Sequence, residues 1–205
     1  MEDYEPLFTF VTCIILIYSS MKKLRYLTIW AILFHALPMA NINAQNSSLV
    51  VYFSHSGHTR SVAIEIKNNT GATIFEIIPE KNYSSNYQAL LDQAKAEINA
   101  GAHPAIKPID SGIELYDTIY VGSPCWWGTI APPVATFLSS YDFSGKVIVP
   151  FMTHEGSGMG HSEKDIRALC PKAVLLKGLP VRGSLSDQAA PQIKEWLQKS
   201  IYRQN

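Results

Sequence analysis

The segment 54–59 combines the residue types expected of an anion-binding loop, with two serines, a glycine and a threonine among its six residues. It follows the apolar run 49–53 and opens a segment whose apolar residues have helical spacing, so a buried strand is predicted to turn here into a helix. The unpaired amides of a helix start and the helix dipole both favour a negatively charged ligand. Because no lysine follows Gly57, a nucleoside-triphosphate loop is a poor match and a bound phosphate monoester fits better. The alternative is a capped turn without a ligand.

Two tryptophans, Trp126 and Trp127, lie next to each other on a predicted loop at 123–128. Neighbouring residues on a loop cannot easily bury both indoles in one place, although the alternative is that both fill the core. An indole left exposed beside an anion-binding loop suits a flat aromatic ligand, which gains about 0.5–1.5 kcal/mol from stacking. The sequence therefore predicts a ring-binding surface at this loop.

A third loop, 153–158, is rich in glycine, which lets backbone amides approach a ligand closely. Amides directed at the polar atoms of a heteroaromatic ring would fix its orientation and tune its redox potential. An ordinary flexible loop is the alternative. His154 and Glu155 could form an acid–base pair, but neighbours on a loop need not point together. The histidines show no spacing that favours a metal ligand set, so we predict no metal site.

Five short apolar runs alternate with helical patterns, and these elements must position the loops. The predicted strands are 49–53, 72–78, 118–122, 147–152 and 173–179, and the predicted helices include 86–100 and 186–200. This alternation predicts an α/β fold with a parallel sheet covered on both faces. All three loops follow carboxyl ends of strands, which gather beside the switch point of an open parallel sheet. Pro150 removes a ladder donor inside the fourth strand, which predicts a bulge or a register adjustment there.

The chain has 205 residues, which allows one domain with a substantial core. Basic and acidic residues balance at 17 each, and this balance argues against a nucleic-acid surface, which would show a basic excess. The cysteines Cys13, Cys125 and Cys170 lack metal-ligand spacing. Cys125 and Cys170 could pair in an oxidising compartment, although two free, buried thiols fit the sequence better.

Residues 1–44 are predicted to lie outside the fold. A basic start at 21–25, an apolar stretch at 27–37 and a small, polar end form the layout of a secretory signal peptide that begins at Met21. The apolar stretch is about half of the ~20 residues that a membrane-spanning helix needs. We therefore expect a domain at 45–205 that is exported to the periplasm or the extracellular space without a stable membrane span. The alternative is a membrane anchor formed by the uncleaved N-terminus.

Taken in order, these motifs resemble the flavodoxin superfamily, and most closely its bacterial flavodoxin-like domain proteins. The matching patterns are Ser-x-Ser-Gly-x-Thr at 54–59, Gly-x-Pro-x-Trp-Trp-Gly at 122–128, Asp-Phe-Ser-Gly-Lys at 142–146 and Thr-x-Glu-Gly-Ser-Gly at 153–158. One such motif would be weak, whereas four in the expected order over residues 49–197 are specific. The resemblance implies a flavodoxin-like three-layer sandwich, a five-stranded parallel sheet of order 2-1-3-4-5 and a bound flavin mononucleotide (FMN).

Carried over residue by residue, the resemblance implies three sets of FMN-binding residues. The phosphate set is Ser54, Ser56, Gly57, His58 and Thr59, the set flanking the isoalloxazine ring and the ribityl chain is Pro124, Cys125, Trp126, Trp127 and Gly128, and the set at the polar edge of the ring is Thr153, His154, Glu155, Gly156, Ser157 and Gly158. His58 occupies the variable position of the phosphate loop and could add charge to the phosphate contact. The neutral domain is unlike strongly acidic electron-carrier flavodoxins, which weakens the case for docking to a basic partner.

Three functions fit these residues. The first is an FMN-binding electron-transfer protein that exchanges electrons with a redox partner protein or a small planar acceptor through the exposed ring edge. The second is an FMN-dependent NAD(P)H:quinone-type reductase, in which the cofactor supplies the chemistry and the protein supplies position and polarity. The third is a non-catalytic flavin-binding module. A reductase needs room for a second planar substrate, and the predicted helix 86–100, with Tyr83 and Tyr87, could cover that space.

Overall fold

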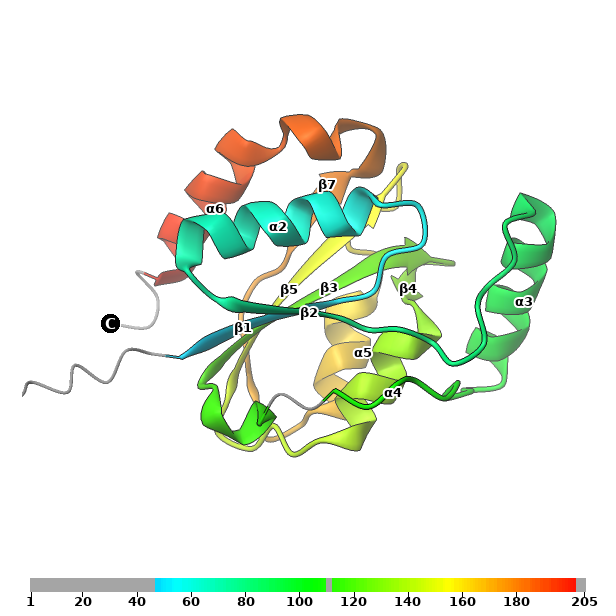
Figure 1. Cartoon of the computed structure of the whole chain (residues 1–205), viewed down its shortest axis with the longest axis horizontal. Helices are drawn as coiled ribbons and strands as arrows, with labels where there is room; N and C mark the ends of the chain where they lie inside the picture. Colours follow the sequence, from blue (N-terminus) through cyan, green and yellow to red (C-terminus); the bar gives the residue numbers. More distant parts are fainter. Residues whose placement is uncertain (1–46, 110–111, 202–205) are drawn as a thin grey trace, which may run out of the picture. The chain divides into compact units, whose positions relative to one another are not determined.

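The computed structural model describes residues 47–109 and 112–201, without the side chains of the last two residues, so the predicted signal segment lies outside the described part. The described residues form a parallel sheet with helices on both of its faces (Figure 1). None of the described helices has the length and the apolar character required to cross a bilayer.

The central sheet has the strand order predicted from the sequence. Its parallel strands are β1 (Ser48–Tyr52), β2 (Thr73–Glu76), β3 (Thr118–Trp126), β5 (Val147–His154) and, in the fifth position, β6 (Val174–Leu175) and β7 (Leu179–Arg182). They are arranged β2-β1-β3-β5-β6, and β7 also pairs with β5. Because β6 and β7 share one position, this order is the expected 2-1-3-4-5, and the predicted α/β three-layer sandwich is confirmed.

The fifth strand is interrupted, and Pro150 on β5 accounts for the break. The register between β3 and β5 runs without a bulge through the Val121–Pro150 pair, so the predicted bulge is wrong on this side. On the other side, β6 pairs with Val147 and Ile148, and β7 resumes only at Phe151. Leu176 still donates to the Ile148 carbonyl, whereas Pro150 has no N–H to offer in the same direction. The proline therefore splits the neighbouring strand and leaves its own strand regular. Between the pairs Ile148–Leu175 and Phe151–Leu179 the neighbour has one residue more than β5, so the predicted register adjustment is confirmed on this side.

Four helices cover the sheet. On one face, α2 (His58–Thr70) and α6 (Ala190–Ile201) pack on alternate strand residues such as Val50 and Phe151. On the other face, α4 (Pro132–Ser140) and α5 (Ser162–Leu169) pack on residues of the opposite parity, such as Val51 and Met152. The parity of each strand residue therefore decides which helical layer it contacts, as expected for a sheet buried on both sides.

The helix α3 (Tyr87–Asn99) does not belong to either layer. It lies beyond the carboxyl ends of the strands, at the right of Figure 1. The Asn86 side chain caps it by accepting the Ala89 N–H at 3.0 Å. Only Leu90 and Ala94 of this helix are buried, so α3 is attached to the domain along a narrow stripe. Its position makes it a side wall at the carboxyl edge of the sheet.

The remaining elements are short. They are the 3-10 turns η1 (Ile113–Leu115) and η2 (Gly183–Gln188) and the strand β4 (Thr129–Ile130), which pairs antiparallel with the end of β3. The predicted loop 123–128 is therefore wrong in its first four residues, which continue β3 to Trp126, and only residues 127 and 128 form the tip of a β-hairpin. The last helix, predicted to begin at Ser186, begins at Ala190, because Ser186 lies inside the 3-10 turn η2.

Candidate functional site

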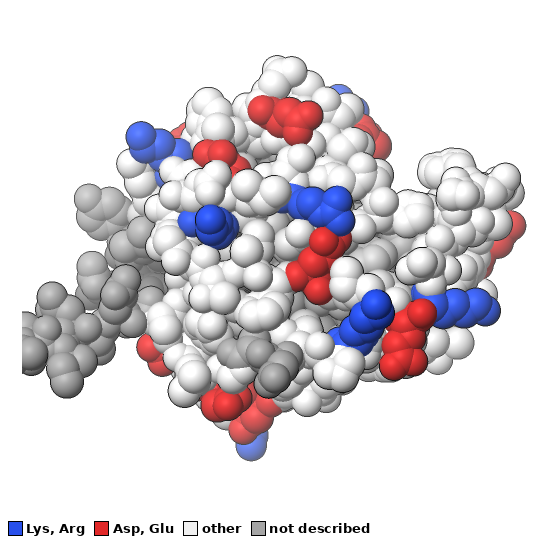
Figure 2. Space-filling model, in the orientation of Figure 1, with Lys and Arg blue, Asp and Glu red and all other residues white. Residues whose placement is uncertain are grey.

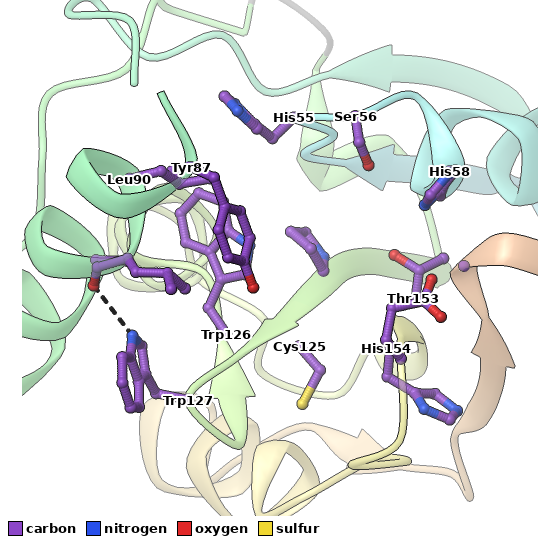
Figure 3. A pocket seen from close by; sticks show the side chains of 15 residues that line it. His55, Ser56, His58, Tyr87, Leu90, Cys125, Trp126, Trp127, Thr153 and His154 are labelled. Carbon is purple, nitrogen blue, oxygen red and sulfur yellow. Dashed lines mark hydrogen bonds between the residues drawn. The ribbon is translucent and has the colours of Figure 1, made fainter. Parts of the chain in front are cut away.

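A pocket of about 530 Å³ opens at the carboxyl ends of the parallel strands. Its walls come from the β1–α2 loop, the β3–β4 hairpin, the end of β5, the start of η2 and one side of α3 (Figure 3). The residues that line it are His55, Ser56, His58, Tyr87, Leu90, Leu91, Ala94, Pro124, Cys125, Trp126, Trp127, Thr153, His154, Glu155 and Gly183. The three loops predicted to converge at this edge of the sheet do meet here.

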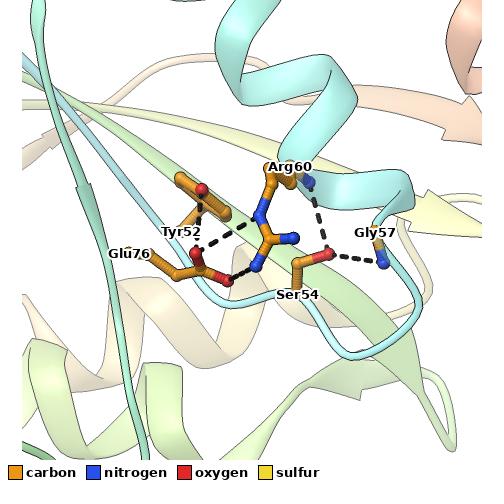
Figure 4. A network of polar contacts seen from close by, with 5 residues as sticks. All are labelled: Tyr52, Ser54, Gly57, Arg60 and Glu76. Atoms are coloured by element: carbon orange, nitrogen blue, oxygen red, sulfur yellow. Dashed lines mark hydrogen bonds and ion pairs between the residues drawn. The ribbon is translucent and has the colours of Figure 1, made fainter.

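The β1–α2 loop is folded around the hydroxyl group of Ser54. Its Oγ accepts the N–H of Gly57 at 3.1 Å and the N–H of Arg60 at 3.3 Å (Figure 4). Gly57 has φ of +92°, a conformation that a residue with a side chain rarely adopts. Ser54 therefore shapes the loop and does not line the pocket itself.

Amides at the start of α2 and just before it are left for a ligand. Within residues 47–109 and 112–201, the N–H groups of Ser56, His58 and Thr59 have no hydrogen-bond partner. No acidic side chain lies in the first turn of α2, so nothing there neutralises the positive end of the helix dipole. These amides, together with the Ser56 hydroxyl, form what we call the amide cradle. The geometry and charge of the amide cradle suit an anion such as a phosphate group.

Arg60 follows the amide cradle on α2 but faces away from it. Its guanidinium pairs with the Glu76 carboxylate at 2.6 Å, and Glu76 also accepts the Tyr52 hydroxyl at 3.2 Å (Figure 4). Burial, the main cause, raises the pKa of Tyr52, so this hydroxyl stays protonated as a donor. The positive charge of Arg60 is therefore already engaged on β2.

A pair of buried hydroxyls fixes the amide cradle relative to β5. Thr59 on α2 and Thr153 near the end of β5 are 1% and 5% exposed, and their Oγ1 atoms are 2.8 Å apart. The net contribution of such a hydrogen bond to the free energy of folding is small, but a conformation that leaves either buried hydroxyl unpaired is destabilised. The pair therefore couples the position of the phosphate end of the pocket to the position of its ring end.

Trp126 forms a rigid aromatic wall. Its ring makes edge contacts with Tyr83 and Phe53, at centroid distances of 5.0 and 5.5 Å, and with His55 at 6.2 Å. Tyr83 is also anchored, since its hydroxyl donates to the Glu97 carboxylate, and burial is the largest cause that raises the pKa of Tyr83. The Trp126 indole is thus held from three sides, and its half-buried surface faces the pocket (Figure 3).

Trp127 occupies the tip of the β3–β4 hairpin and reaches across to α3. Its φ of +51° and the φ of +85° at Gly128 form a two-residue hairpin turn of the kind that needs two positive φ angles. The indole N–H donates to the Leu91 carbonyl at 3.1 Å, and the Lys95 ammonium lies 4.7 Å from the ring centroid. Trp127 therefore adopts an unfavourable backbone angle at a position from which its side chain attaches α3 to the site.

Glu155 has a structural role at the end of β5. Its carboxylate accepts the backbone N–H of Ser184 at 2.8 Å and the Ser184 hydroxyl at 3.1 Å, and its carbonyl accepts from Arg182. A side chain on Gly183 would place its Cβ 2.6 Å from His58 Nδ1 and 2.8 Å from Glu155 Oε1. The β1–α2 loop, the β5 end and the η2 turn are therefore in close contact at one glycine.

The predicted site residues separate into two groups. Those that line the pocket are Ser56, His58, Pro124, Cys125, Trp126, Trp127, Thr153, His154 and Glu155. Those that do not line it are Ser54, Gly57, Thr59, Gly128, Gly156, Ser157 and Gly158. His154 Nδ1 accepts the Gly156 N–H at 3.0 Å, which is a local turn contact. Gly128 accepts the His161 N–H at 2.8 Å on the outer side of the hairpin.

Sequence reasoning missed two parts of the lining. Gly183 comes from the far end of the chain, and no motif at 181–184 indicated a contact with segment 54–59. Leu90, Leu91 and Ala94 were visible only as the apolar stripe of a helix, although the helix itself was expected near the site. The histidine at 55 was seen in the loop but was not assigned to the site.

The thiols do not form a disulfide or a metal site in the described residues. Cys125 and Cys170 are both free; Cys125 is half-buried in the pocket wall, and Cys170 is buried beside the Leu138 carbonyl. Burial raises the pKa of Cys170 to about 11. Among residues 47–109 and 112–201, no three or more metal-ligating side chains gather in one place.

The fold and the pocket define a doubly wound α/β protein with an anion cradle and an aromatic wall at its switch point. The chain belongs to the flavodoxin family, because the model of that family, described as flavodoxin, matches residues 47–200. The predicted family is therefore confirmed. No curated protein matches the chain.

Solved structures agree with this assignment. A protein described as a flavoprotein from Bacteroides uniformis aligns with a TM-score of 0.67 at 29% identity, over 75% of this chain and 98% of the other. A second, from Bacteroides eggerthii, aligns with a TM-score of 0.64 at 27% identity, over 74% and 96% of the two chains. A flavoprotein from Lactobacillus acidophilus, solved in complex with FMN, shares the fold with a TM-score of 0.60 at 22% identity, over 70% and 97%.

The residues present fit FMN. The amide cradle offers three N–H donors and a hydroxyl to a phosphate, and the Trp126 wall offers a flat apolar surface to a ring. The pocket volume of about 530 Å³ falls within the roughly 300–1,000 Å³ of small-molecule sites. Bound FMN would supply redox chemistry, and the chain would supply the grip on the phosphate and the surroundings of the ring.

Proposed function

We propose that the protein binds FMN non-covalently and carries electrons through the bound flavin. The observation that supports this proposal most is that the three unpaired amides of the cradle and the aromatic wall of Trp126 open into one cavity. Membership of the flavodoxin family and the FMN complex of the Lactobacillus acidophilus relative support the same cofactor. The exchange of electrons would occur with a redox partner protein or a small planar acceptor.

The test of the cofactor compares FMN with riboflavin, which lacks the phosphate. Each flavin is titrated into the purified protein while its visible spectrum and fluorescence are recorded. FMN is expected to bind much more tightly than riboflavin, because only FMN can use the amide cradle. Unchanged flavin fluorescence over the whole titration would refute the proposal.

A pair of glycine variants separates the cradle from general backbone strain. Gly57→Ala and Gly71→Ala both place a side chain at a positive φ, +92° and +70°, with no atom within 4 Å of the new Cβ. Each is expected to cost about 1–2 kcal/mol of folding free energy. Only Gly57→Ala is expected to weaken FMN binding, because Gly71 lies at the other end of α2. Equal loss of FMN affinity in both variants would contradict the assigned role of the loop.

A quinone-type reductase is the second candidate. The observation that favours it is the apolar side of α3, whose Tyr87, Leu90 and Leu91 line the pocket where a second planar reactant would bind. Stepwise anaerobic reduction distinguishes the two functions. Two separate one-electron steps support a carrier, whereas steady oxidation of NADH or NADPH in the presence of a quinone supports a reductase.

We also propose that the protein is exported, on the basis of the signal-like layout that begins at Met21. Its counterpart is a membrane-anchored form that keeps the N-terminus. Expression of the full chain in a bacterial host, followed by fractionation and N-terminal sequencing, decides between them. A soluble product in the periplasm that begins near Gln45 is the expected result, and an intact N-terminus in the membrane fraction would contradict export with cleavage.

A further inference from the structure

We infer that His58 determines how strongly the phosphate end of the pocket holds FMN, because its imidazole takes up a proton when the phosphate binds. The inference rests on the proposed function, since the phosphate in question is that of FMN. It goes beyond that function by making the affinity for FMN depend on pH and by naming the side chain that carries the proton.

The amide cradle has no cationic side chain of its own. Its donors are backbone N–H groups and the Ser56 hydroxyl, and the described pocket lining contains no lysine and no arginine. Arg60, the nearest guanidinium along the chain, pairs with Glu76 at 2.6 Å. On the face shown in Figure 2, basic and acidic side chains are interspersed, without a patch of one sign. A phosphate dianion in the cradle can therefore gain a positive partner only from a histidine of the lining.

Three histidines line the pocket, and His58 is the one placed at the phosphate end. His55 belongs to the ring end, where its ring centroid lies 6.2 Å from that of Trp126. His154 Nδ1 accepts the Gly156 N–H at 3.0 Å, and a charged imidazole, which has a proton on both nitrogens, would lose this contact. His58 is the first residue of α2, its own N–H belongs to the cradle, and Figure 3 shows it across the pocket from Trp126.

The surroundings of the His58 ring leave its charge to be decided by the ligand. The ring is half-buried and has no hydrogen-bond partner in the described part of the chain. Its Nδ1 lies 2.6 Å from the point that a Cβ on Gly183 would occupy, and the Glu155 Oε1 lies 2.8 Å from the same point. The two atoms are therefore no farther apart than the sum of these distances, a range in which a carboxylate favours a charged imidazole. The positive end of the α2 dipole acts against that charge, so a bound phosphate shifts the balance towards it.

Other titratable or charged side chains on the elements around His58 were considered for the same role. They are His55 and Arg60 beside it in the chain, His154 and Glu155 at the end of β5, Arg182 on β7 and Asp187 on η2. Arg182 is engaged with Glu155 at 3.8 Å, and Asp187 is exposed. Among these, Glu155 shares with His58 the contact point at Gly183. The proton at this end is therefore assigned to His58, with Glu155 as its neighbouring carboxylate.

The sign of the pH dependence follows from these charges. Histidine changes its charge between about pH 5 and 8, and a phosphate monoester gains its second negative charge near about pH 6. Above that pH, loss of the His58 proton removes an attraction, so the affinity for FMN falls as the pH rises. We expect a fall of at least about fivefold between about pH 6.5 and 8.5, the effect of one charge a few ångströms away in water. A single proton limits the slope to about tenfold per pH unit.

The test titrates FMN into the full chain, freed of flavin, by isothermal titration calorimetry in buffers of different ionisation enthalpy. The dependence of the heat on the buffer gives the number of protons taken up for each FMN bound. Near about pH 7.5 we expect uptake of up to about one proton with FMN and no uptake with riboflavin, which lacks the phosphate. Phosphate buffer is left out, because inorganic phosphate would compete for the cradle.

Substitutions of His58 separate its charge from its size. His58→Gln is neutral at every pH, so we expect no proton uptake and an affinity for FMN close to that of the wild type at high pH. His58→Lys stays charged up to about pH 8.5, so we expect high affinity throughout and again no proton uptake. His103→Gln is the matched control, because His103 is an exposed histidine outside this pocket, and it is expected to keep both the uptake and the slope.

The outcomes separate this inference from the proposed function. A protein that does not alter the FMN spectrum overturns both. FMN binding without proton uptake, or with the same uptake in His58→Gln as in the wild type, overturns the inference alone. Loss of the uptake in His55→Gln, with His58→Gln unchanged, would assign the proton to the ring end and overturn it as well.

Discussion

The contact between the amide cradle and β5 can be tested most directly by replacing the hydroxyl groups of Thr59 and Thr153. In the variant Thr153→Val a methyl group of similar size replaces the hydroxyl, and the Thr59 hydroxyl loses its partner at a position that is 1% exposed. A buried hydroxyl without a partner costs about 1–3 kcal/mol. For a chain of this length we expect a decrease in melting temperature of about 2–4 °C for each kcal/mol.

The double variant Thr59→Val/Thr153→Val tests the physical reason for this loss. Replacing both partners by apolar groups of the same shape leaves no unpaired hydroxyl, and such a replacement is nearly neutral. We therefore expect the double variant to be about as stable as the wild type, and more stable than either single variant. If each single variant costs about 1–3 kcal/mol and the double variant is nearly neutral, the coupling free energy between the two sites equals the sum of the single effects with opposite sign, about 2–6 kcal/mol.

Urea unfolding of the four proteins in the cycle measures these free energies. Thr73→Val is the control, because Thr73 is exposed on β2 and its replacement is expected to change stability by less than about 0.5 kcal/mol. FMN titration of the same proteins reports whether the cradle has moved relative to β5, and weaker binding is expected in both single variants. Additive losses, with the double variant the least stable, would refute the reasoning.

Three further predictions concern other contacts of the site and the core. Trp127→Phe keeps a ring at the hairpin tip but removes the N–H that donates to the Leu91 carbonyl at 3.1 Å. Amide hydrogen exchange in α3 is expected to accelerate about 2- to 12-fold, the factor that corresponds to one hydrogen bond of about 0.5–1.5 kcal/mol. Unchanged exchange would contradict this role of Trp127. Gly183→Ala adds a Cβ that would lie 2.6 Å from His58 Nδ1, so FMN titration is expected to show weaker binding, whereas Gly156→Ala, with no atom within 4 Å of its new Cβ, serves as the control. Burial raises the pKa of Cys170 to about 11, above its unfolded value near 9. Because the unfolded state loses this proton first, the free energy of unfolding is expected to fall between about pH 9 and 11, by at most about 1.4 kcal/mol per pH unit. The same pH series on Cys170→Ala should lack this part of the slope.

The order of the sheet could be predicted from the sequence because each strand is a short apolar run followed by a helical pattern. Residues such as Val50 and Val51 face opposite helical layers, so both had to be apolar, and that requirement is visible without a structure. The split of the fifth strand could not be predicted in the same way. Pro150 signalled a missing donor, but only the pairing of β5 with β6 and β7 shows which neighbour lacks it.

The candidate site was predictable where it is local and unpredictable where distant segments meet. The cradle follows from one strand-to-helix turn, so its residues stand together in the sequence. The hairpin at Trp127 carries no Asn-Gly or Asp-Gly signal, because a tryptophan occupies the first positive-φ position. The contact of Gly183 with His58 and Glu155 joins three segments far apart in the chain, and a single sequence does not show which distant segments lie close together in space.

These long-range contacts explain how the pocket holds its shape without relying on any one loop. The Thr59–Thr153 pair joins the cradle to β5, Glu155 joins β5 to η2, and Trp127 joins the hairpin to α3. Each wall is therefore fixed by a neighbouring wall, and little ordering should remain to be done when a ligand binds. The weakest of these joins is at α3, which buries only Leu90 and Ala94 of its own. Movement of the pocket is therefore expected on its α3 side, while the phosphate end stays fixed.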